Sequence, residues 1–125
     1  MIDGISIVDA AYKAAWSRKA EDIIVLDVRG MTIIADYVVL ASGTSDRHVR
    51  AIADAVLYDI KEMGLLPLRR DGTCEAGWIV LDYADTIVHV FHVREREYYD
   101  LERLYRGAPV IRASGPVLED EATKY

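Results

Sequence analysis

At 125 residues and 14.0 kDa the chain is the size of one domain with a real hydrophobic core. Hydrophobic residues make up 52% and charged residues 29%, a globular composition far from that of disordered chains. Fifteen Lys and Arg against 21 Asp and Glu give a net charge of -6, and the cations are not clustered. Direct nucleic-acid recognition is therefore disfavoured, and the charge favours either a basic protein surface as partner or no charged partner at all.

The cysteine content and the N-terminus bear on the compartment. Cys74 has no second cysteine to pair with and no Cys or His nearby at zinc spacing, which is consistent with a reducing environment. The first residues lack the basic region of a signal peptide, and no apolar run approaches the length of a membrane span. We therefore expect a cytoplasmic protein that does not contact a membrane.

The first elements in chain order are a helix and two strands. Apolar residues at three- and four-residue steps predict an amphipathic helix over residues 5–18. Residues 22–28 are apolar on both alternating sets, which predicts a strand covered on both faces. A second strand, residues 35–41, ends at Ser42 and Gly43, where we expect the glycine to adopt the positive φ of a tight turn.

A second helix follows that turn. Thr44 or Ser45 is expected to cap it, and its apolar stripe runs through residues 49–63. Gly64 stands where a left-handed C-terminal cap belongs, and Pro67 prevents the helix from resuming.

The last predicted elements are a β-hairpin and a helix. Residues 78–82 and 86–93 form two short apolar runs joined by three residues, the pattern of a hairpin. A helix beginning near Arg94 is expected to place Tyr98, Leu101 and Tyr105 on one side. The order of elements predicts an α/β fold: a single domain, residues 1–106, with a mixed β-sheet flanked by helices. Residues 107–125 are expected to form a partly ordered C-terminal tail.

The glycine turn at residues 42–45 is a candidate phosphate site, because free amides at a helix start bind anions. It lacks the Gly-Lys-Ser/Thr ending of a Walker loop, so a plain capped turn is favoured. Nucleotidyl transfer would also need a pair of alternating carboxylates for two metal ions, and no Asp-x-Asp or Asp-x-Glu lies in the strands that follow. A nucleotide-binding or nucleotidyl-transferring enzyme using the Gly43 turn is therefore the alternative function.

The histidines do not predict a metal site. His89 and His92 are an odd number of residues apart on one strand, so they face opposite sides of the sheet. We expect His89 to be hydrogen-bonded in or near the core and His48 to pack or cap in the first helical turn. Cys74 is expected to be a surface-loop thiol, and no cofactor is predicted.

Aromatic and acidic residues gather on the predicted hairpin. Trp78, Val80 and Asp82 alternate onto one face, while Asp82 and Asp85 bracket the turn beside Tyr83. Aromatic residues with charged neighbours are typical interface anchors. A core tryptophan with solvated turn acids is an equally weighted alternative.

Five blocks, in order and spacing, resemble the ribosomal silencing factor (Iojap-like) family: DIIVLDV at 22–28, DYVVLASGTSDRHVRAIAD at 36–54, GLLPL at 64–68, WIVLDYADTIVHVF at 78–91 and REYYDLERLY at 96–105. The combination of GTSxRHV with WxxLDYxDxxVHVF is specific to that family. The resemblance does not extend past Gly107.

This resemblance implies a small domain related to the nucleotidyltransferase fold but without catalytic carboxylates, so the protein is not expected to be an enzyme. It implies binding to the large ribosomal subunit through ribosomal protein uL14, which blocks association with the small subunit and represses translation. It also implies a homodimer when the protein is free. The net charge of -6 would favour encounter with a basic ribosomal surface.

The resemblance also suggests site residues. The partner-binding face is predicted to comprise Trp78, Leu81, Asp82, Tyr83 and Asp85, with Tyr98, Tyr99 and Leu101 as neighbours. A structural turn or secondary contact is predicted for Gly43, Thr44, Ser45, Arg47 and His48. The sequence departs from the family at Ala84, where glycine is common, and at Tyr105, where tryptophan is usual. Ala84 is expected to alter or strain the hairpin turn.

Overall fold

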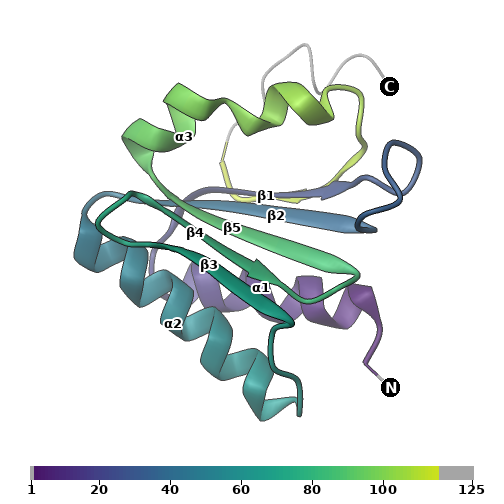
Figure 1. Cartoon of the computed structure of the whole chain (residues 1–125), viewed down its shortest axis with the longest axis horizontal. Helices are drawn as coiled ribbons and strands as arrows, with labels where there is room; N and C mark the ends of the chain where they lie inside the picture. The colour runs from purple at the N-terminus through teal and green to yellow at the C-terminus, as the bar shows by residue number, and fades with distance from the viewer. Residues whose placement is uncertain (1, 116–125) are drawn as a thin grey trace.

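A six-stranded mixed β-sheet organises the part of the chain that the computed structural model describes, residues 2–115 (Figure 1). The strands are β1 (Glu21–Asp27), β2 (Tyr37–Gly43), β3 (Arg69–Thr73), β4 (Trp78–Asp82), β5 (Thr86–His92) and β6 (Val110–Ala113), in the spatial order β3-β4-β5-β2-β1-β6. The central pair β2 and β5 is parallel, and the other neighbouring pairs in this sheet are antiparallel. This confirms the predicted α/β fold with a single mixed sheet.

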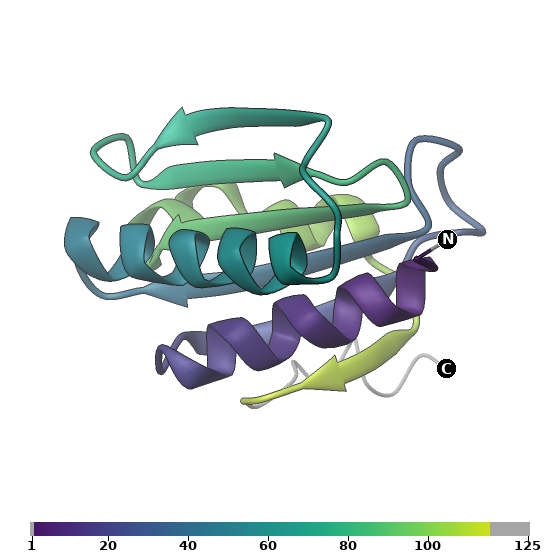
Figure 2. The ribbon, with the colours of Figure 1, turned by 90° about the horizontal axis from the view of Figure 1, so that it is seen from below.

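Two helices, α1 (Gly4–Ser17) and α2 (Asp46–Glu62), lie side by side across one face of the sheet (Figure 2). Each begins at a side-chain cap: Asp3 Oδ1 accepts from Ser6 N at 2.8 Å, and Ser45 Oγ accepts from His48 N at 3.1 Å. Their apolar stripes bury the larger of two hydrophobic clusters against the inward-facing residues of the strands. The amphipathic spacing therefore predicts both helices correctly to within one or two residues.

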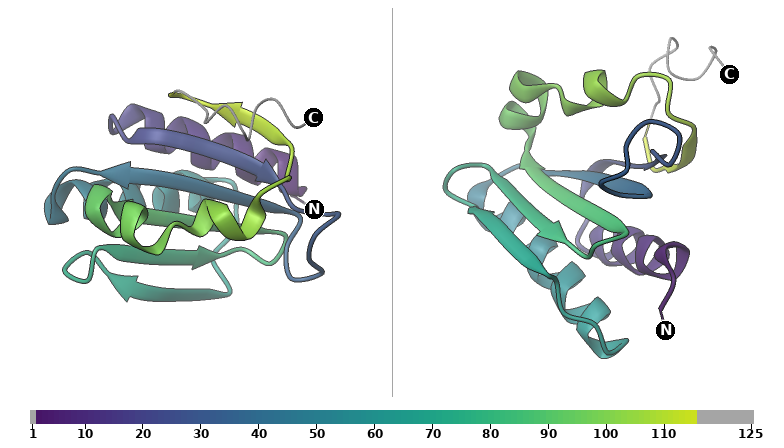
Figure 3. Two further views of the ribbon diagram at one scale, coloured as in Figure 1. Left: turned by 90° about the horizontal axis from the view of Figure 1, so that it is seen from above. Right: turned by 45° about the vertical axis from the view of Figure 1, so that its right-hand side comes forward.

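The opposite face of the sheet carries α3 (Val93–Tyr99) and the 3-10 helix η1 (Leu101–Tyr105). Seen from above, they cross the middle of the sheet and leave β4 and β3 to one side (Figure 3). The smaller hydrophobic cluster lies beneath them and comprises Ile24, Leu26, Val28, Ala35, Val38, Leu40, Phe91, Leu101 and Ala108. One face of the sheet is thus covered by two long helices over its central strands, and the other face is covered over a smaller part, with β3 exposed at the edge.

Arg96 anchors α3 to the sheet. Its guanidinium donates to Ser42 Oγ at 3.0 Å and to the carbonyl oxygen of Asp22, and it forms an ion pair with Glu102 at 3.0 Å. The Arg96 side chain is only 11% exposed, so its bonds to Ser42 and Glu102 are partly shielded from water. Because Glu102 belongs to η1, one arginine joins α3, η1 and two strands.

The final helix differs from the prediction. Asp100 adopts the left-handed conformation, with a φ of 46°, and divides the predicted helix into α3 and η1. As a result Tyr98 is 81% exposed while Leu101 is buried and Tyr105 packs on the smaller cluster. The predicted shared side for these three residues is therefore wrong, because the helical period is interrupted between them.

The chain after Gly107 also differs from the expected tail. Residues Val110–Ala113 form β6, which pairs antiparallel with β1 at the edge of the sheet, and Ala108 is buried. The sheet therefore extends beyond the predicted domain boundary at residue 106. The rest of the predicted tail, residues 116–125, lies outside the described residues.

Candidate functional site

The part of the sheet left uncovered by α3 and η1 is the candidate functional surface. On β4, Trp78, Val80 and Asp82 are partly exposed on this side, whereas Ile79 and Leu81 are buried on the other. This alternation follows from the two-residue period of a strand. We call the surface formed by Trp78, Val80 and Asp82 the open sheet face.

Trp78 is the centre of an aromatic cluster on the open sheet face. Its indole Nε1 donates to Nδ1 of His89 at 3.1 Å. Ring centroids lie 4.8 Å away in Phe91 and 4.7 Å away in Tyr99, so the indole contacts both β5 and α3. Such a partly exposed tryptophan, fixed on several sides, has the character of an interface anchor.

His89 is the polar member of this cluster. Burial lowers the pKa of His89 to about 4, so its ring is neutral at pH 7. Since Nδ1 accepts the Trp78 bond, the proton of the neutral ring is on Nε2. The prediction of a hydrogen-bonded, largely buried histidine is confirmed.

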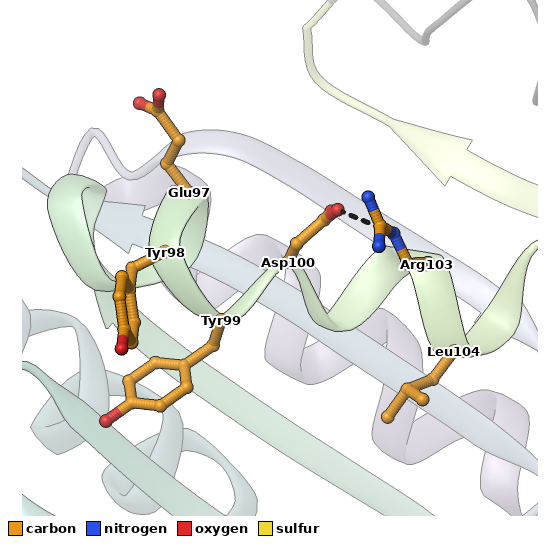
Figure 4. A pocket seen from close by; sticks show the side chains of 6 residues that line it. All are labelled: Glu97, Tyr98, Tyr99, Asp100, Arg103 and Leu104. Atoms are coloured by element: carbon orange, nitrogen blue, oxygen red, sulfur yellow. Dashed lines mark ion pairs between the residues drawn. The ribbon is translucent and has the colours of Figure 1, made fainter.

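A pocket of about 390 Å³ lies at the junction of α3 and η1, beside the open sheet face (Figure 4). Tyr98, Tyr99 and Leu104 extend to one side of the two helices and are 81%, 51% and 70% exposed. Asp100 and Arg103 form an ion pair at 3.4 Å above them. The pocket thus adds an exposed apolar rim to the aromatic cluster.

The hairpin turn brings Asp82 to the end of the open sheet face, and Asp85 follows at the sheet edge, where its Cβ lies near Gly4 at the start of α1. Asp82 Oδ1 accepts from the amide of Ala84 at 2.8 Å, and Ala84 has a φ of 71°. Asp85 is exposed, and its carbonyl oxygen accepts from the amides of Asp36 and Tyr37. The turn is therefore anchored to β2, and Ala84 occupies the left-handed region that favours glycine.

Three residues predicted for the partner-binding face are buried. Leu81 and Tyr83 are 0% and 4% exposed and belong to the larger cluster beneath the sheet, and Leu101 is 9% exposed under η1. Burial raises the pKa of Tyr83 to about 12. These three side chains support the surface from beneath. They do not form its exposed part, where they are predicted to lie.

Of the other predicted residues, Trp78, Asp82, Asp85, Tyr98 and Tyr99 are partly or fully exposed. Two residues outside the predicted set, Val80 and Leu104, share this surface. The exposure of Val80 could be predicted from sequence, because Val80 alternates with Trp78 and Asp82 on the same side of the strand. The exposure of Leu104 could not be predicted from a sequence pattern, because it follows from the break in the helix at Asp100.

The Gly43 turn is tightly packed. Gly43 has no positive φ, contrary to the prediction; instead, a Cβ there would lie 2.8 Å from the backbone nitrogen of Val49. Thr44 N donates to His48 Nδ1 at 2.9 Å, and His48 Nε2 donates to the carbonyl of Arg18 at 2.8 Å. These bonds join the end of α1 to the start of α2.

Three of the amides at this turn donate to groups within the protein. Besides Thr44 N, the amides of His48 and Val49 donate to the side chain and carbonyl of Ser45. Arg47 is exposed on the first turn of α2. A phosphate would have to compete with these internal bonds for the amides of Thr44, His48 and Val49.

Metal and membrane features are lacking in the described part of the chain. No group of three or more His, Cys, Asp or Glu residues among residues 2–115 is arranged to hold a metal ion. Within the same residues, no helix is long and apolar enough to span a membrane. Cys74 is partly exposed and donates to Glu75 at 3.3 Å, which raises the pKa of the thiol.

The chain matches a family model described as "Ribosomal silencing factor during starvation" over residues 3–125. The match includes the region after Gly107, which the motif resemblance does not reach. A crystal structure of a Chromobacterium violaceum protein superposes with a TM-score of 0.81 at 29% identity, covering 95% of this chain and 98% of that one. A Bacillus halodurans crystal structure gives a TM-score of 0.76 at 32% identity, covering 87% and 99%.

Curated relatives agree with the family model. The ribosomal silencing factor RsfS of Bacillus subtilis is 41% identical over 105 residues, which are 84% of this chain and 89% of the relative. RsfS of Halalkalibacterium halodurans is 35% identical over 111 residues, 89% of this chain and 95% of the relative. This chain belongs to the ribosomal silencing factor family.

Proposed function

We propose that this protein binds the large ribosomal subunit through ribosomal protein uL14 and blocks association with the small subunit, thereby repressing translation. Family membership supports the ribosomal target. The observation that supports particular residues is the fixed, partly exposed Trp78 with its aromatic rim at one end of β4, together with the carboxylates of the hairpin turn at the other end. Trp78 is thus an aromatic anchor, and Asp82 with Asp85 forms an acidic edge at the far end of the strand.

In this proposal the site residues divide into two groups. The exposed side chains of Trp78, Asp82, Asp85, Tyr98 and Tyr99 contact the ribosomal protein. The second group packs beneath that surface and supports it: Leu81, Tyr83 and Leu101. The net charge of -6 favours encounter with a basic partner.

The proposal also covers the state of the free protein. It is a cytoplasmic homodimer that contacts no membrane, recognises little or no nucleic acid directly, needs no cofactor and catalyses no reaction. The alternative, a nucleotide-binding enzyme at the Gly43 turn, is disfavoured because the amides of Thr44, His48 and Val49 bond within the protein. The residues at that turn, Gly43, Thr44, Ser45, Arg47 and His48, serve to set α2 against α1 or make a secondary contact.

A subunit-joining experiment on sucrose gradients tests the function. Purified protein is added to separated ribosomal subunits, and both the joined peak and the position of the protein are followed. We expect the protein to sediment with the large subunit and the joined peak to be lost. A protein that stays at the top of the gradient without affecting joining would refute the proposal, and nucleotide titration would then test the alternative.

A charge variant tests the assigned surface. Asp82→Asn combined with Asp85→Arg changes the acidic edge, while the asparagine introduced at position 82 retains an oxygen to accept from the amide of Ala84. We expect this variant to lose large-subunit binding with little change in melting temperature. The matched control is Asp54→Asn with Asp59→Arg, which makes the same charge change on the exposed side of α2 and should still bind. Equal binding by both variants would contradict the assignment.

A further inference from the structure

The orientation of Trp78 depends on a residue that has little surface of its own. We propose that His89 is the positioning residue for partner docking: it fixes the indole of Trp78 in one orientation on the open sheet face. The inference rests on the proposed function, since it concerns how the same surface recognises its partner. His89 is 8% exposed and so acts through Trp78.

The ring contacts and the hydrogen bond restrain different motions of the indole. Phe91 and Tyr99, with centroids 4.8 and 4.7 Å away, restrict the space that the ring plane can occupy. Rotation by about 180° about the χ2 torsion keeps a ring in nearly the same plane but exchanges its two edges. The bond from Nε1 to His89 Nδ1 distinguishes these two orientations, because it is made in only one of them.

His89 is itself held in place. It lies on β5, which is paired on both sides, with Leu40 of β2 and Val80 of β4 as its neighbours in register. Its ring is stacked on Phe91, with centroids 6.0 Å apart and planes 13° from parallel. The acceptor for the indole is thus a buried side chain on an interior strand, not a mobile surface group.

A fixed anchor lowers the cost of docking. A partner that binds a preoriented side chain does not have to order it, and the ordering of one such side chain corresponds to about a threefold to tenfold change in affinity. Without the acceptor, the indole N–H is left beside apolar rings or must turn toward solvent. Loss of the His89 acceptor should therefore weaken binding even though His89 makes no contact with the partner.

Two substitutions separate the acceptor from the bulk of the ring. His89→Leu nearly preserves the volume and removes the acceptor, whereas His89→Asn retains an oxygen close to the position of Nδ1. Binding of the full chain to the large subunit would be measured for both variants. We expect about threefold to tenfold weaker binding for His89→Leu, mainly through faster dissociation, and substantial recovery of affinity in His89→Asn.

The indole N–H resonances give a readout specific to positioning. The chain has two tryptophans, and Trp16, which is 61% exposed, serves as an internal reference. In His89→Leu we expect the Trp78 indole resonance to shift and its hydrogen exchange to accelerate while Trp16 is unchanged. His89→Asn should move the Trp78 signals back toward those of the wild type.

The outcomes separate this inference from the proposed function. An unmoved Trp78 resonance in His89→Leu, or a moved resonance with unaltered binding, would overturn the positioning role while leaving ribosome binding intact. Weakening in both variants to the same extent would also overturn it, because the retained acceptor would have no effect. Failure of the wild-type protein to bind the large subunit would refute the proposed function itself, and this inference with it.

Discussion

The hairpin turn between β4 and β5 contains a residue whose backbone conformation does not suit its side chain. Ala84 has a φ of 71°, in the left-handed region where a Cβ approaches the neighbouring carbonyl oxygen. The bond from its amide to Asp82 Oδ1, together with the anchoring of the turn on β2, holds it there. Ala84→Gly should therefore stabilise the protein.

The expected gain is the difference between two effects. An alanine in this conformation costs about 1–2 kcal/mol relative to the right-handed region. Glycine avoids that cost but gives the unfolded chain more freedom, which offsets about 0.4–1 kcal/mol. The net increase in the free energy of unfolding is about 0.5–1 kcal/mol, or about 2–4 °C in melting temperature for a domain of this size.

Urea unfolding followed by circular dichroism measures this difference, and two other glycines provide controls. Gly64 has a φ of 94°, and a Cβ added there would meet no atom within 4 Å, so Gly64→Ala should cost about 1 kcal/mol from conformation alone. Gly30 has equally open space without a positive φ, so Gly30→Ala should not destabilise. A loss of stability in Ala84→Gly, with the controls behaving as expected, would refute the reasoning.

Two further predictions concern packing and acid stability. Gly43→Ala should lower the free energy of unfolding by about 1–3 kcal/mol, because its Cβ would press on the backbone nitrogen of Val49; a urea midpoint like that of the wild type would contradict this. The pKa of His89 is about 4 in the folded protein and 6.5 for a free histidine. As the pH drops from 7, the unfolded chain therefore binds a proton at this residue before the folded chain does. The free energy of unfolding should fall across this pH range. This should remove about 3 kcal/mol between pH 7 and 4, and His89→Asn should show a correspondingly smaller loss in urea titrations at the two pH values.

The elements that could be predicted from sequence are those whose burial requires apolar residues to recur at a regular spacing. Six elements pack against a core and lie, to within two residues, where their patterns predict them. They are the amphipathic helices α1 and α2 and the apolar strands β1, β2, β4 and β5. β3 reads RRDGT and is exposed at every position, so no alternation marks it. β6 has four residues close to glycine and proline, and its pairing with β1 depends on a contact across most of the chain.

In the candidate site, too, some positions follow from local periodicity and others do not. The alternation that places Trp78 and Asp82 on one face also places Leu81 on the other, and its burial agrees with that rule although the motif resemblance assigns it to the surface. That Tyr98 and Leu101 face different sides could not be derived in this way, because it depends on the left-handed conformation of Asp100 between them. Local periodicity thus predicts which side of a strand a residue occupies, while a break in a helix changes what its neighbours face.

The pairing of β6 with β1 has a consequence for shortened forms of the chain. β1 has Ile24 and Leu26 buried at positions that pair with Ala113 and Val110, and the amide of Asp27 donates to the carbonyl of Pro109. A chain cut before Pro109 would leave this apolar strand as an unpaired edge. Such edges recruit strands from other molecules. Premature termination near the C-terminus would therefore produce a species prone to self-association, and the last strand protects the sheet against aggregation.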